Sequence, residues 1–350
     1  MTLENIITDK IKQEGHINIR EFINIALFHQ KFGYYINHNP IGKNYDFTTS
    51  SEISQIFGEI IAFYLIDFWQ QNYPNKPINL VEMGAGHGTL MLDFLRIANR
   101  IPDFSKKINI HIIEINNNLK QIQQDKLQDF NIKWCSNFDE FSQNCQNLPV
   151  FFISNELFDC FAIDQFIFEK GGWYQKIIIL DQNQLKFDKI KTKIAIDSLI
   201  PDKFKHNVQD GAIFEHNIAA EDFMQKLSQK IAKNNGIAIN IDYGYYQNNF
   251  NDTLQSIKKH KFNNILNNIG ESDLTSHVNF YPLAQICLNN KLNVNFMTQR
   301  EFLLSNGLEL RKNILLKSNA NNKEEIISSI SRLIDNNQMG NLFKVIISRN

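Results

Sequence analysis

Three closely spaced glycines follow an apolar run that has the length of a buried strand. Residues 79–90 read NLVEMGAGHGTL, which places Gly84, Gly86 and Gly88 between this run and a second apolar, helix-compatible run. Glycine lets the backbone turn sharply and lets a ligand approach it closely. In an open α/β sheet, a loop of this kind lies at the carboxyl ends of the strands, where ligands bind. The pattern therefore predicts a site for a nucleotide-like ligand.

The spacing of the glycines separates three classes of ligand. A phosphate-binding P-loop requires a Lys after the last glycine, and none follows here. A dinucleotide fingerprint is G-x-G-x-x-G, whereas this loop is G-x-G-x-G preceded by an acid, Glu82. That acid suits the amino group of a methionine moiety and would repel a pyrophosphate. The loop thus favours S-adenosylmethionine over a nucleoside triphosphate or NAD.

A second carboxylate is expected on the ribose of the ligand. Glu114 ends the next strand-like run, INIHIIE, 26 residues after Gly88. A carboxylate there can accept hydrogen bonds from both ribose hydroxyls. NAD sites use such an acid as well, so Glu114 supports an adenosine-containing ligand without identifying it. Glu82 is the residue that favours S-adenosylmethionine over NAD.

The elements that position these residues alternate between strands and helices. We expect strands at 78–83, 108–114, 132–135, 150–154, 212–216 and 236–242, helices at 89–99, 118–127 and 219–234, a hairpin around Gly171-Gly172, and a C-terminal strand at 342–348 that adds antiparallel at an edge. Such alternation is typical of a parallel sheet that is covered on both faces. One or two helices are expected within 4–30, and a helix from a cap at 48–52 to about residue 71.

Composition excludes several classes of function. The chain has 350 residues, a formal charge of −1 and no long Lys/Arg run, so nucleic acid is not an expected partner. Its four cysteines are scattered, and its nine histidines show no ligand spacing, so no metal is expected. The most apolar segment, 60–69, is too short to cross a membrane. We expect a cytoplasmic protein without membrane insertion.

Six ordered motifs give the sequence a specific resemblance. GYYINHNPIGKNYDFTTSSEISQIFGE, LVEMGAGHGTLMLDFLR, SNELFDCFAIDQF, INIDYGY, DLTSHVNF and MGNLFKVIIS together resemble the MidA-like family of class I, S-adenosylmethionine-dependent methyltransferases. The resemblance covers the chain from about residue 15 to its end. One departure is Ala85-Gly86-His87, where many relatives carry Pro-Gly-Arg; it alters the polarity of the loop and removes no glycine.

The resemblance implies a fold, a domain division and an acceptor. The fold is a Rossmann-like α/β methyltransferase domain with a seven-strand sheet at 76–350, a helical N-terminal segment with a lid loop at 1–75, and substrate-binding insertions at about 165–215 and 243–283. The acceptor is an arginine of a protein, which in eukaryotic members is a core subunit of respiratory complex I. A respiratory NADH dehydrogenase subunit is therefore one expected partner.

Methyl transfer from a sulfonium is an in-line displacement that needs positioning more than acid–base power. Glu156 and Asp159 follow a strand directly and stand three residues apart, so one turn can place both on one side. Two carboxylates can hold a guanidinium by planar hydrogen bonds. One of the two could instead bind the amino group of the cofactor, together with Asn155, or the pair could simply favour a helix N-terminus.

Further residues are expected around the acceptor and the cofactor. Asp242 could orient a tyrosine or the acceptor, or bond to backbone. Asp273, Thr275 and His277 are expected to line the acceptor cleft, and His277 could take up the released proton. Lid residues that could contact the cofactor are Tyr34, Tyr35, Phe47, Thr48 and Glu52.

Three alternatives remain open from the sequence. The enzyme could methylate a small molecule or another side chain. The chain could be an assembly factor that has kept the fold and lost catalysis, although its intact glycines and Glu114 argue against this. It could be an NAD-dependent oxidoreductase, which the glycine spacing and Glu82 disfavour.

Overall fold

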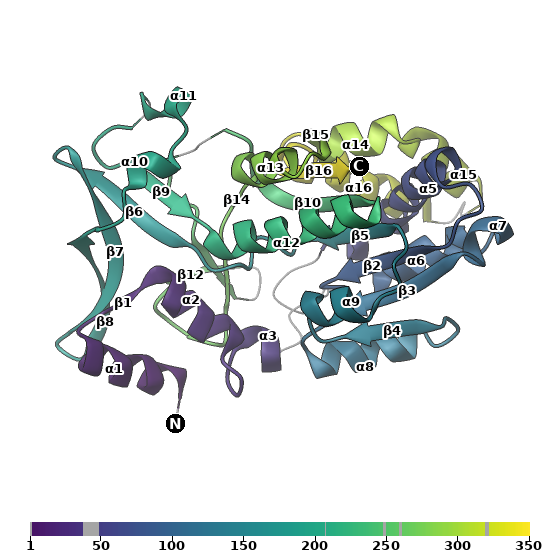
Figure 1. Cartoon of the computed structure of the whole chain (residues 1–350). Coiled ribbons are helices and arrows are strands. Elements are labelled where there is room, and N and C mark those ends of the chain that lie inside the picture. The colour runs from purple at the N-terminus through teal and green to yellow at the C-terminus, as the bar shows by residue number, and fades with distance from the viewer. Residues whose placement is uncertain (1, 38–48, 207, 248–249, 259–260, 319–321) are drawn as a thin grey trace.

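The fold is described from a computed structural model of the chain (Figure 1). The structure describes residues 2–37, 49–206, 208–247, 250–258, 261–318 and 322–350. Within these residues, no helix is both long enough and apolar enough to cross a membrane.

A large mixed sheet forms the right-hand part of the molecule in Figure 1. Its strands, in spatial order, are β15 (Asn293–Thr298), β16 (Phe343–Arg349), β10 (Ile237–Tyr245), β5 (Val150–Asn155), β2 (Ile78–Met83), β3 (Ile108–Ile113) and β4 (Ile132–Cys135), with the short β14 (Val278–Asn279) beside β10. β10, β5, β2, β3 and β4 are parallel to their neighbours in this run. Their carboxyl ends therefore meet at one edge of the sheet.

The observed sheet differs from the expected one in two respects. It has eight strands rather than seven, because the two-residue β14 pairs with the end of β10. The C-terminal strand β16 is antiparallel, as expected, but it lies between β10 and β15 rather than at the edge. The edge strand β15 was not predicted from the sequence; it is six residues long and none of its residues is fully buried.

Helices cover both faces of this sheet. One face carries α5 (Gln55–Asn72), α6 (Thr89–Ala98), α14 (Gln299–Ser305), α15 (Leu308–Ser318) and α16 (Lys323–Ile334), and the other carries α9 (Phe138–Asn144), α12 (Ile218–Asn234) and α13 (Phe280–Asn289). The remaining helices of this part are α7 (Pro102–Ser105), α8 (Asn117–Lys126) and α17 (Met339–Leu342). Strand β5 shows the cause of the layering. Phe151 and Ile153 enter the first core, and Val150 and Phe152 enter the second, because successive side chains point to opposite faces.

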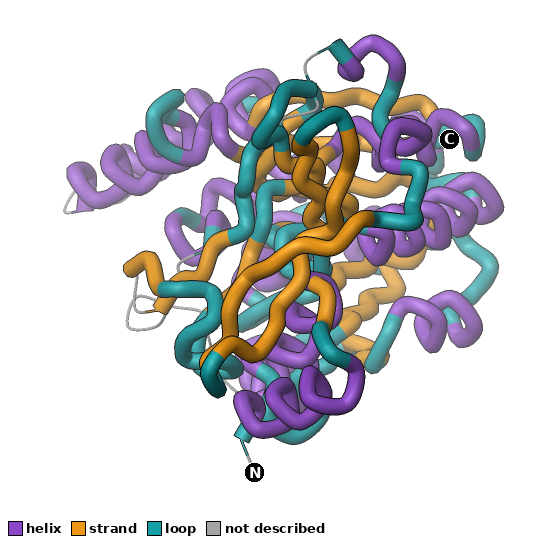
Figure 2. Tube along the Cα trace, turned by 90° about the vertical axis from the view of Figure 1, so that its left-hand side faces the viewer, coloured by secondary structure: helices purple, strands orange, loops and turns teal. Residues whose placement is uncertain are grey.

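A smaller antiparallel sheet forms the left-hand part, which faces the viewer in Figure 2. Its strands are β1 (Ile17–Asn18), β7 (Gly172–Asp181), β6 (Asp164–Glu169), β9 (Ile213–His216) and β8 (Gln184–Lys191), and its helices are α1 (Leu3–Glu14), α2 (Ile19–Phe28), α3 (Tyr34–Asn37), α10 (Ile196–Leu199) and α11 (Asp202–Lys205). The predicted hairpin around Gly171 joins β6 to β7. The helical N-terminal segment contributes a strand to this sheet, since Ile17 pairs with Ile178.

The segment expected to be loop-rich, 243–283, contains regular structure. It forms a three-stranded sheet in the order β12 (Lys261–Asn263), β11 (Gln255–Lys258) and β13 (Asp273–Thr275). These strands are three or four residues long, so the sequence carries too little alternation to reveal them.

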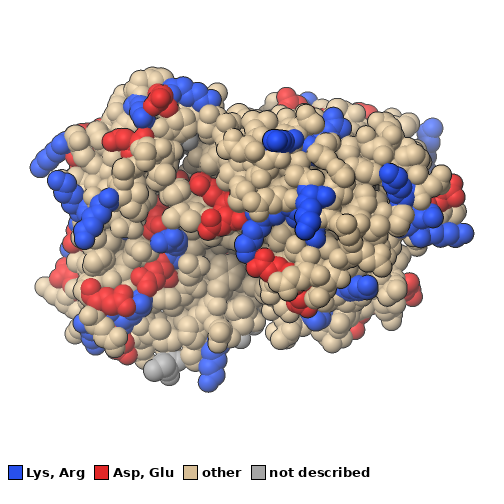
Figure 3. Space-filling view, in the orientation of Figure 1, with Lys and Arg blue, Asp and Glu red and all other residues tan. Residues whose placement is uncertain are grey.

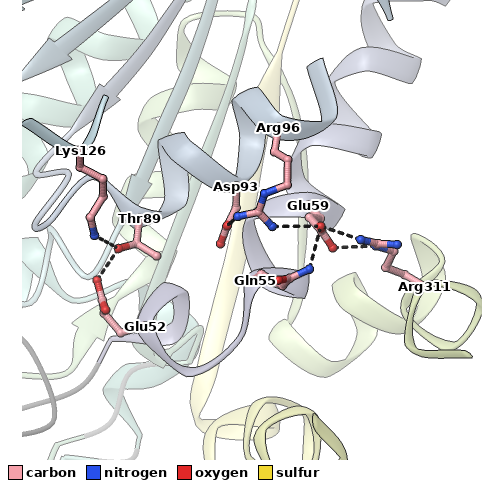
Figure 4. Close-up of polar contacts among 8 residues, drawn as sticks. All are labelled: Glu52, Gln55, Glu59, Thr89, Asp93, Arg96, Lys126 and Arg311. Carbon is pink, nitrogen blue, oxygen red and sulfur yellow. Dashed lines mark hydrogen bonds and ion pairs between the residues drawn. The ribbon is translucent and has the colours of Figure 1, made fainter. Parts of the chain in front are cut away.

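The expected helix from the 48–52 cap to residue 71 is interrupted. A short α4 (Ser50–Ile53) ends at the extended Ser54, and α5 begins at Gln55. Thr49 precedes α4 but makes no capping hydrogen bond through its side chain. The Glu52 carboxylate turns instead to α6, where it accepts a hydrogen bond of 2.6 Å from the Thr89 hydroxyl (Figure 4).

A buried ion-pair network joins α5, α6 and α15 (Figure 4). Glu59 is fully buried, and its two carboxylate oxygens accept hydrogen bonds of 2.7 and 2.8 Å from Nε and Nη2 of Arg311. Gln55 donates a third hydrogen bond, and Arg96 lies 3.5 Å away while it also pairs with Asp93. A bidentate arginine is the geometry that best compensates a buried carboxylate.

We predict that Arg311→Met destabilises the protein by about 3 kcal/mol, because Glu59 would remain buried with only Arg96 as a cation. The double variant Arg311→Met/Glu59→Leu should recover most of this loss, since the buried Glu59 charge is then removed together with its partner. Urea unfolding measures both, with the exposed Arg100→Met as control. A double variant that is less stable than Arg311→Met alone would contradict this account.

Candidate functional site

One cavity of about 580 Å³ lies at the carboxyl ends of the parallel strands. Its walls include most of the residues singled out from the sequence, namely Glu52, Glu82, Gly84, Gly86, Glu114, Asn155, Glu156, Asp159, Asp273, Thr275 and His277. Gly88, which serves as the N-cap of α6, and Tyr34 and Asp242 are not among its lining residues. Phe47 and Thr48 fall outside the described residues. Among the described residues, no cluster of three His, Cys, Asp or Glu side chains is arranged to hold a metal.

The glycine loop presents bare backbone to this cavity. Gly84 and Gly86 have φ values of 72° and 53°, in the left-handed region that glycine adopts readily. A Cβ on Gly84 would stand 3.1 Å from Leu157 Cδ1. The Gly86 carbonyl accepts a hydrogen bond of 2.9 Å from the Gln123 side chain, which fixes the loop.

Glu114 lies beside the loop and is held by its neighbours. One of its oxygens accepts a hydrogen bond of 2.9 Å from the Asn116 amide, and the other accepts one of 3.0 Å from the Gln123 side chain. Burial raises the pKa of Glu114 above its usual value, although these two bonds oppose the rise. A carboxylate has about four acceptor positions, so lone pairs remain for a ligand.

Glu82 is the most strongly perturbed acid of the loop region. Only 3% of the residue is exposed, and its Oε2 atom is buried without a hydrogen-bond partner. Burial, reinforced by the charge of Glu114, raises the pKa of Glu82 to about 8. A buried acceptor without a partner costs free energy unless a ligand supplies a donor.

The turn after β5 brings two carboxyl groups into the cavity wall. Glu156 has a left-handed backbone, with φ of 52°, and its side chain accepts hydrogen bonds from the Ser50 amide at 2.9 Å and from Asn155 at 3.0 Å. Burial raises the pKa of Glu156 to about 7. The Asn155 Oδ1 atom is buried without a partner.

Asp159 completes the turn and is coupled to a tyrosine. Its Oδ2 atom accepts a short hydrogen bond from the Tyr243 hydroxyl, whereas its Oδ1 atom is buried without a partner. Burial raises the pKa of Asp159 to about 6, and the bond from Tyr243 limits the rise. One oxygen is thus positioned by Tyr243, and the other is buried without a hydrogen-bond partner.

Asp242 supports this turn from the end of β10. Its Oδ2 atom accepts hydrogen bonds from the amides of Phe158 and Asp159, at 2.8 and 3.1 Å, and its Oδ1 atom accepts one from the amide of Tyr243. Of the alternatives open from the sequence, the backbone role is therefore the observed one. Asp242 does not line the cavity.

Another part of the cavity wall comes from the three-stranded sheet. Asp273 and Thr275 of β13 line the cavity, and the Tyr35 hydroxyl donates a hydrogen bond of 2.9 Å to Asp273. The His277 ring stands edge-on to the Tyr243 ring, with 5.6 Å between their centroids. Burial lowers the pKa of His277 below its usual value, which favours a neutral imidazole.

Glu52 connects the N-terminal segment to the glycine loop. Its carboxylate lies 3.6 Å from His87 Nδ1, and Thr89 donates to it. The bond with His87 is the main cause that lowers the pKa of Glu52 to about 2. Glu52 is therefore charged and already engaged by protein donors.

Sequence reasoning missed several lining residues of this site, of which three are notable. Cys160 and Arg332 line the cavity, and Ile257 faces it from β11. Arg332 comes from the last turn of the amphipathic α16, where a basic residue is expected for the helix dipole alone. Gln123, which positions both Gly86 and Glu114, gave no signal because it reads as one more polar residue of α8.

The comparisons with known proteins agree with this geometry. Residues 60–298 match the family model described as "Putative S-adenosyl-L-methionine-dependent methyltransferase". "Protein arginine methyltransferase NDUFAF7, mitochondrial" from Xenopus laevis is 30% identical over 98% of this chain and 83% of its own length. The human protein of the same name is 27% identical over 95% of this chain and 80% of its own length.

Solved structures share the fold. The crystal structure of a protein from Burkholderia thailandensis bound to S-adenosyl-homocysteine superposes with a TM-score of 0.86, over 99% of this chain and 92% of that one, at 19% identity. A native crystal structure from the same organism gives a TM-score of 0.84. The arrangement of sheet and helices is thus that of an α/β methyltransferase.

Proposed function

The chain belongs to a family of S-adenosyl-L-methionine-dependent methyltransferases, and we propose that it methylates an arginine of a protein substrate at the cavity described above. We propose arginine as the acceptor because the carboxyl groups of Glu156 and Asp159 both line the cavity. One oxygen of Asp159 is also buried without a hydrogen-bond partner. The curated relatives are named as protein arginine methyltransferases, which supports the same acceptor.

The residues present fit the cofactor. The unpartnered Glu82 Oε2 and Asn155 Oδ1 atoms can accept from its ammonium group, and the bare backbone at Gly84 and Gly86 leaves room for close approach. The remaining lone pairs of Glu114 can accept from the ribose hydroxyls. A cavity of about 580 Å³ is within the usual size of cofactor sites.

When bound, the cofactor supplies a methyl group on a positively charged sulfur. The protein must hold the acceptor nitrogen in line with that methyl group and keep water away. Asp159 is suited to the first task because Tyr243 fixes one of its oxygens, and the other has no protein partner and can accept a hydrogen bond from the guanidinium. Glu156 would bind a second guanidinium nitrogen, since planar, two-point contacts define its orientation.

Methylation of a guanidinium also releases a proton. We propose that His277 takes it up, because its low pKa leaves the imidazole neutral and its ring packs on Tyr243 in the cavity wall. Asp159, which is hydrogen-bonded to Tyr243, is a second acceptor for this proton.

Charge around the site is compatible with a cationic acceptor. Figure 3 shows that the surface is hollowed between the two parts of the molecule, and that acidic side chains, with some basic ones among them, lie beside the hollow. We propose that residues 243–283 bind the acceptor and that the N-terminal segment, residues 1–75, covers the cofactor. A subunit of a respiratory NADH dehydrogenase, met in the cytoplasm, is the partner that we propose.

The experiment is methyl transfer from S-adenosylmethionine carrying a deuterated methyl group into a protein extract of cells that lack this enzyme. Mass spectrometry of the digested proteins should locate the label on arginine, and Asp159→Asn should not produce it. Label on lysine, or on a small molecule alone, would exclude arginine as the acceptor. The absence of any transfer would favour a non-catalytic assembly factor.

We predict that cofactor binding at pH 7 releases a proton. The pKa of about 8 keeps Glu82 protonated in the free protein, and a cationic ammonium group favours its ionised form. Binding should therefore tighten as the pH rises toward 8. Calorimetric titrations in buffers of different ionisation enthalpy measure the release, which should fall in Glu82→Gln and persist in Glu52→Gln, because Glu52 is already charged. Proton uptake, or a release unaffected by Glu82→Gln, would contradict the assignment.

A further inference from the structure

Three side chains form a row across the three-stranded sheet, from the inside of the cavity to the surface. Ile257 of β11 pairs with Asp273 of β13 on one side and with Phe262 of β12 on the other. Directly paired residues of antiparallel strands project from the same face. Because Ile257 and Asp273 line the cavity, Phe262 projects from the cavity-facing side as well. Two strand spacings make this row about 10 Å long.

The outer end of the row is apolar and open to solvent. Phe262 is 81% exposed, the largest exposed fraction among the large hydrophobic side chains of the described residues. In the described part of the chain, β12 pairs only with β11, so its other edge presents unpaired backbone groups. An exposed aromatic beside a free strand edge is a feature of sites that bind extended peptides.

The inner end of the row is acidic. Asp273 is buried and lies within the same cavity wall as Asp159 and Glu156. The row therefore leads from an apolar contact at the surface to carboxyl groups that suit a cation. An arginine side chain has this polarity in the same order, with methylene groups followed by a guanidinium.

A second depression of the surface, beside Phe262, supports an opening into the cofactor cavity there. A depression of about 530 Å³ is lined by residues 251–256 together with Phe262, Asn263 and Ile265. It shares two wall residues, Gln255 and His277, with the cofactor cavity. The two spaces are therefore adjacent.

We propose that an extended segment of the protein substrate docks along β12 against Phe262, and that its arginine reaches the cavity past Ile257 and Gln255. This inference rests on the proposed arginine methylation and adds the route and the chemistry of the flanking sequence. Side chains two residues apart lie on one face of an extended chain. The residue two positions from the arginine should therefore be apolar, so that it packs on Phe262.

The test uses peptides of about 13 residues with a central arginine, and with either leucine or serine two positions to each side of it. We expect wild type to prefer the leucine peptides through a lower KM. Phe262→Ala should raise that KM about tenfold and remove the preference, with kcat and cofactor affinity within about twofold of wild type. Leu310→Ala is the matched control, because Leu310 is 70% exposed and comes from α15, which contributes no lining residue to either hollow.

The outcomes separate the two proposals. If wild type methylates the peptides and Phe262→Ala leaves the KM unchanged, the docking route is wrong and arginine methylation stands. If wild type methylates none of the peptides but labels arginine in the protein extract, docking through a short extended segment is also wrong. If wild type transfers methyl groups to a different side chain, the proposed function fails and the route fails with it.

Discussion

Asp159→Asn is expected to lower kcat for arginine methylation by about 100- to 1000-fold, because it replaces an acceptor of guanidinium hydrogen bonds by a group that also donates. The cofactor dissociation constant should change by less than about threefold, since Asp159 is not needed for the ribose or ammonium contacts. Turnover of a labelled arginine substrate and calorimetric cofactor binding measure the two effects separately.

The controls for this variant distinguish chemistry from folding. Asp67→Asn makes the same change on α5, at an exposed residue whose carboxylate accepts a hydrogen bond from Gln71, and should retain full activity. Tyr243→Phe removes the donor that positions Asp159 and should lower kcat less than Asp159→Asn does. An Asp159→Asn enzyme with wild-type kcat on arginine would show that this residue does not hold the acceptor.

Gly86→Val is expected to weaken cofactor binding by more than about 100-fold. The backbone at Gly86 has φ of 53°, a conformation that a β-branched residue adopts only with strain. Its side chain would also stand where the loop borders the cavity. The Gln123 bond to the Gly86 carbonyl resists any movement of the loop that could relieve this. Calorimetric titration with S-adenosylmethionine measures the loss.

A second glycine variant distinguishes the effect of backbone strain on stability from a direct effect on cofactor binding. Gly307 has φ of 96° in the turn between α14 and α15, and a Cβ there would meet nothing within 4 Å. Gly307→Val should therefore be strained and destabilised, but it should bind the cofactor normally. If Gly86→Val and Gly307→Val bind S-adenosylmethionine with the same affinity, the substitution at Gly86 affects only the stability of the protein, and the loop is not the cofactor site.

The sequence predicted those features that depend on local pattern. The apolar runs of β2, β3, β5 and β10 are long enough to identify buried parallel strands, and polar residues at their ends indicate the ligand edge. The acids Glu82, Glu114, Glu156 and Asp159 follow from that rule, because each stands at or just after the end of a strand.

Features that depend on distant pairing could not be read from the sequence. The Tyr35 bond to Asp273 joins residues 238 positions apart, and β1 pairs with β7 although Ile17 and its partner Ile178 are far apart in the sequence. The role of Asp242 stayed open because a strand-end acid can face a ligand or the backbone, and only the turn after β5 decides between them. Phe262 became meaningful only through its register with Ile257.

The most direct test of the account uses an analogue of the cofactor that carries a guanidinium in place of the transferred methyl group. Its affinity should exceed that of the matching uncharged alkyl analogue by about 100-fold, and Asp159→Asn should remove most of the difference. This measurement requires no knowledge of the acceptor protein. Equal affinities of the two analogues for wild type would contradict the claim that Glu156 and Asp159 bind an arginine beside the cofactor.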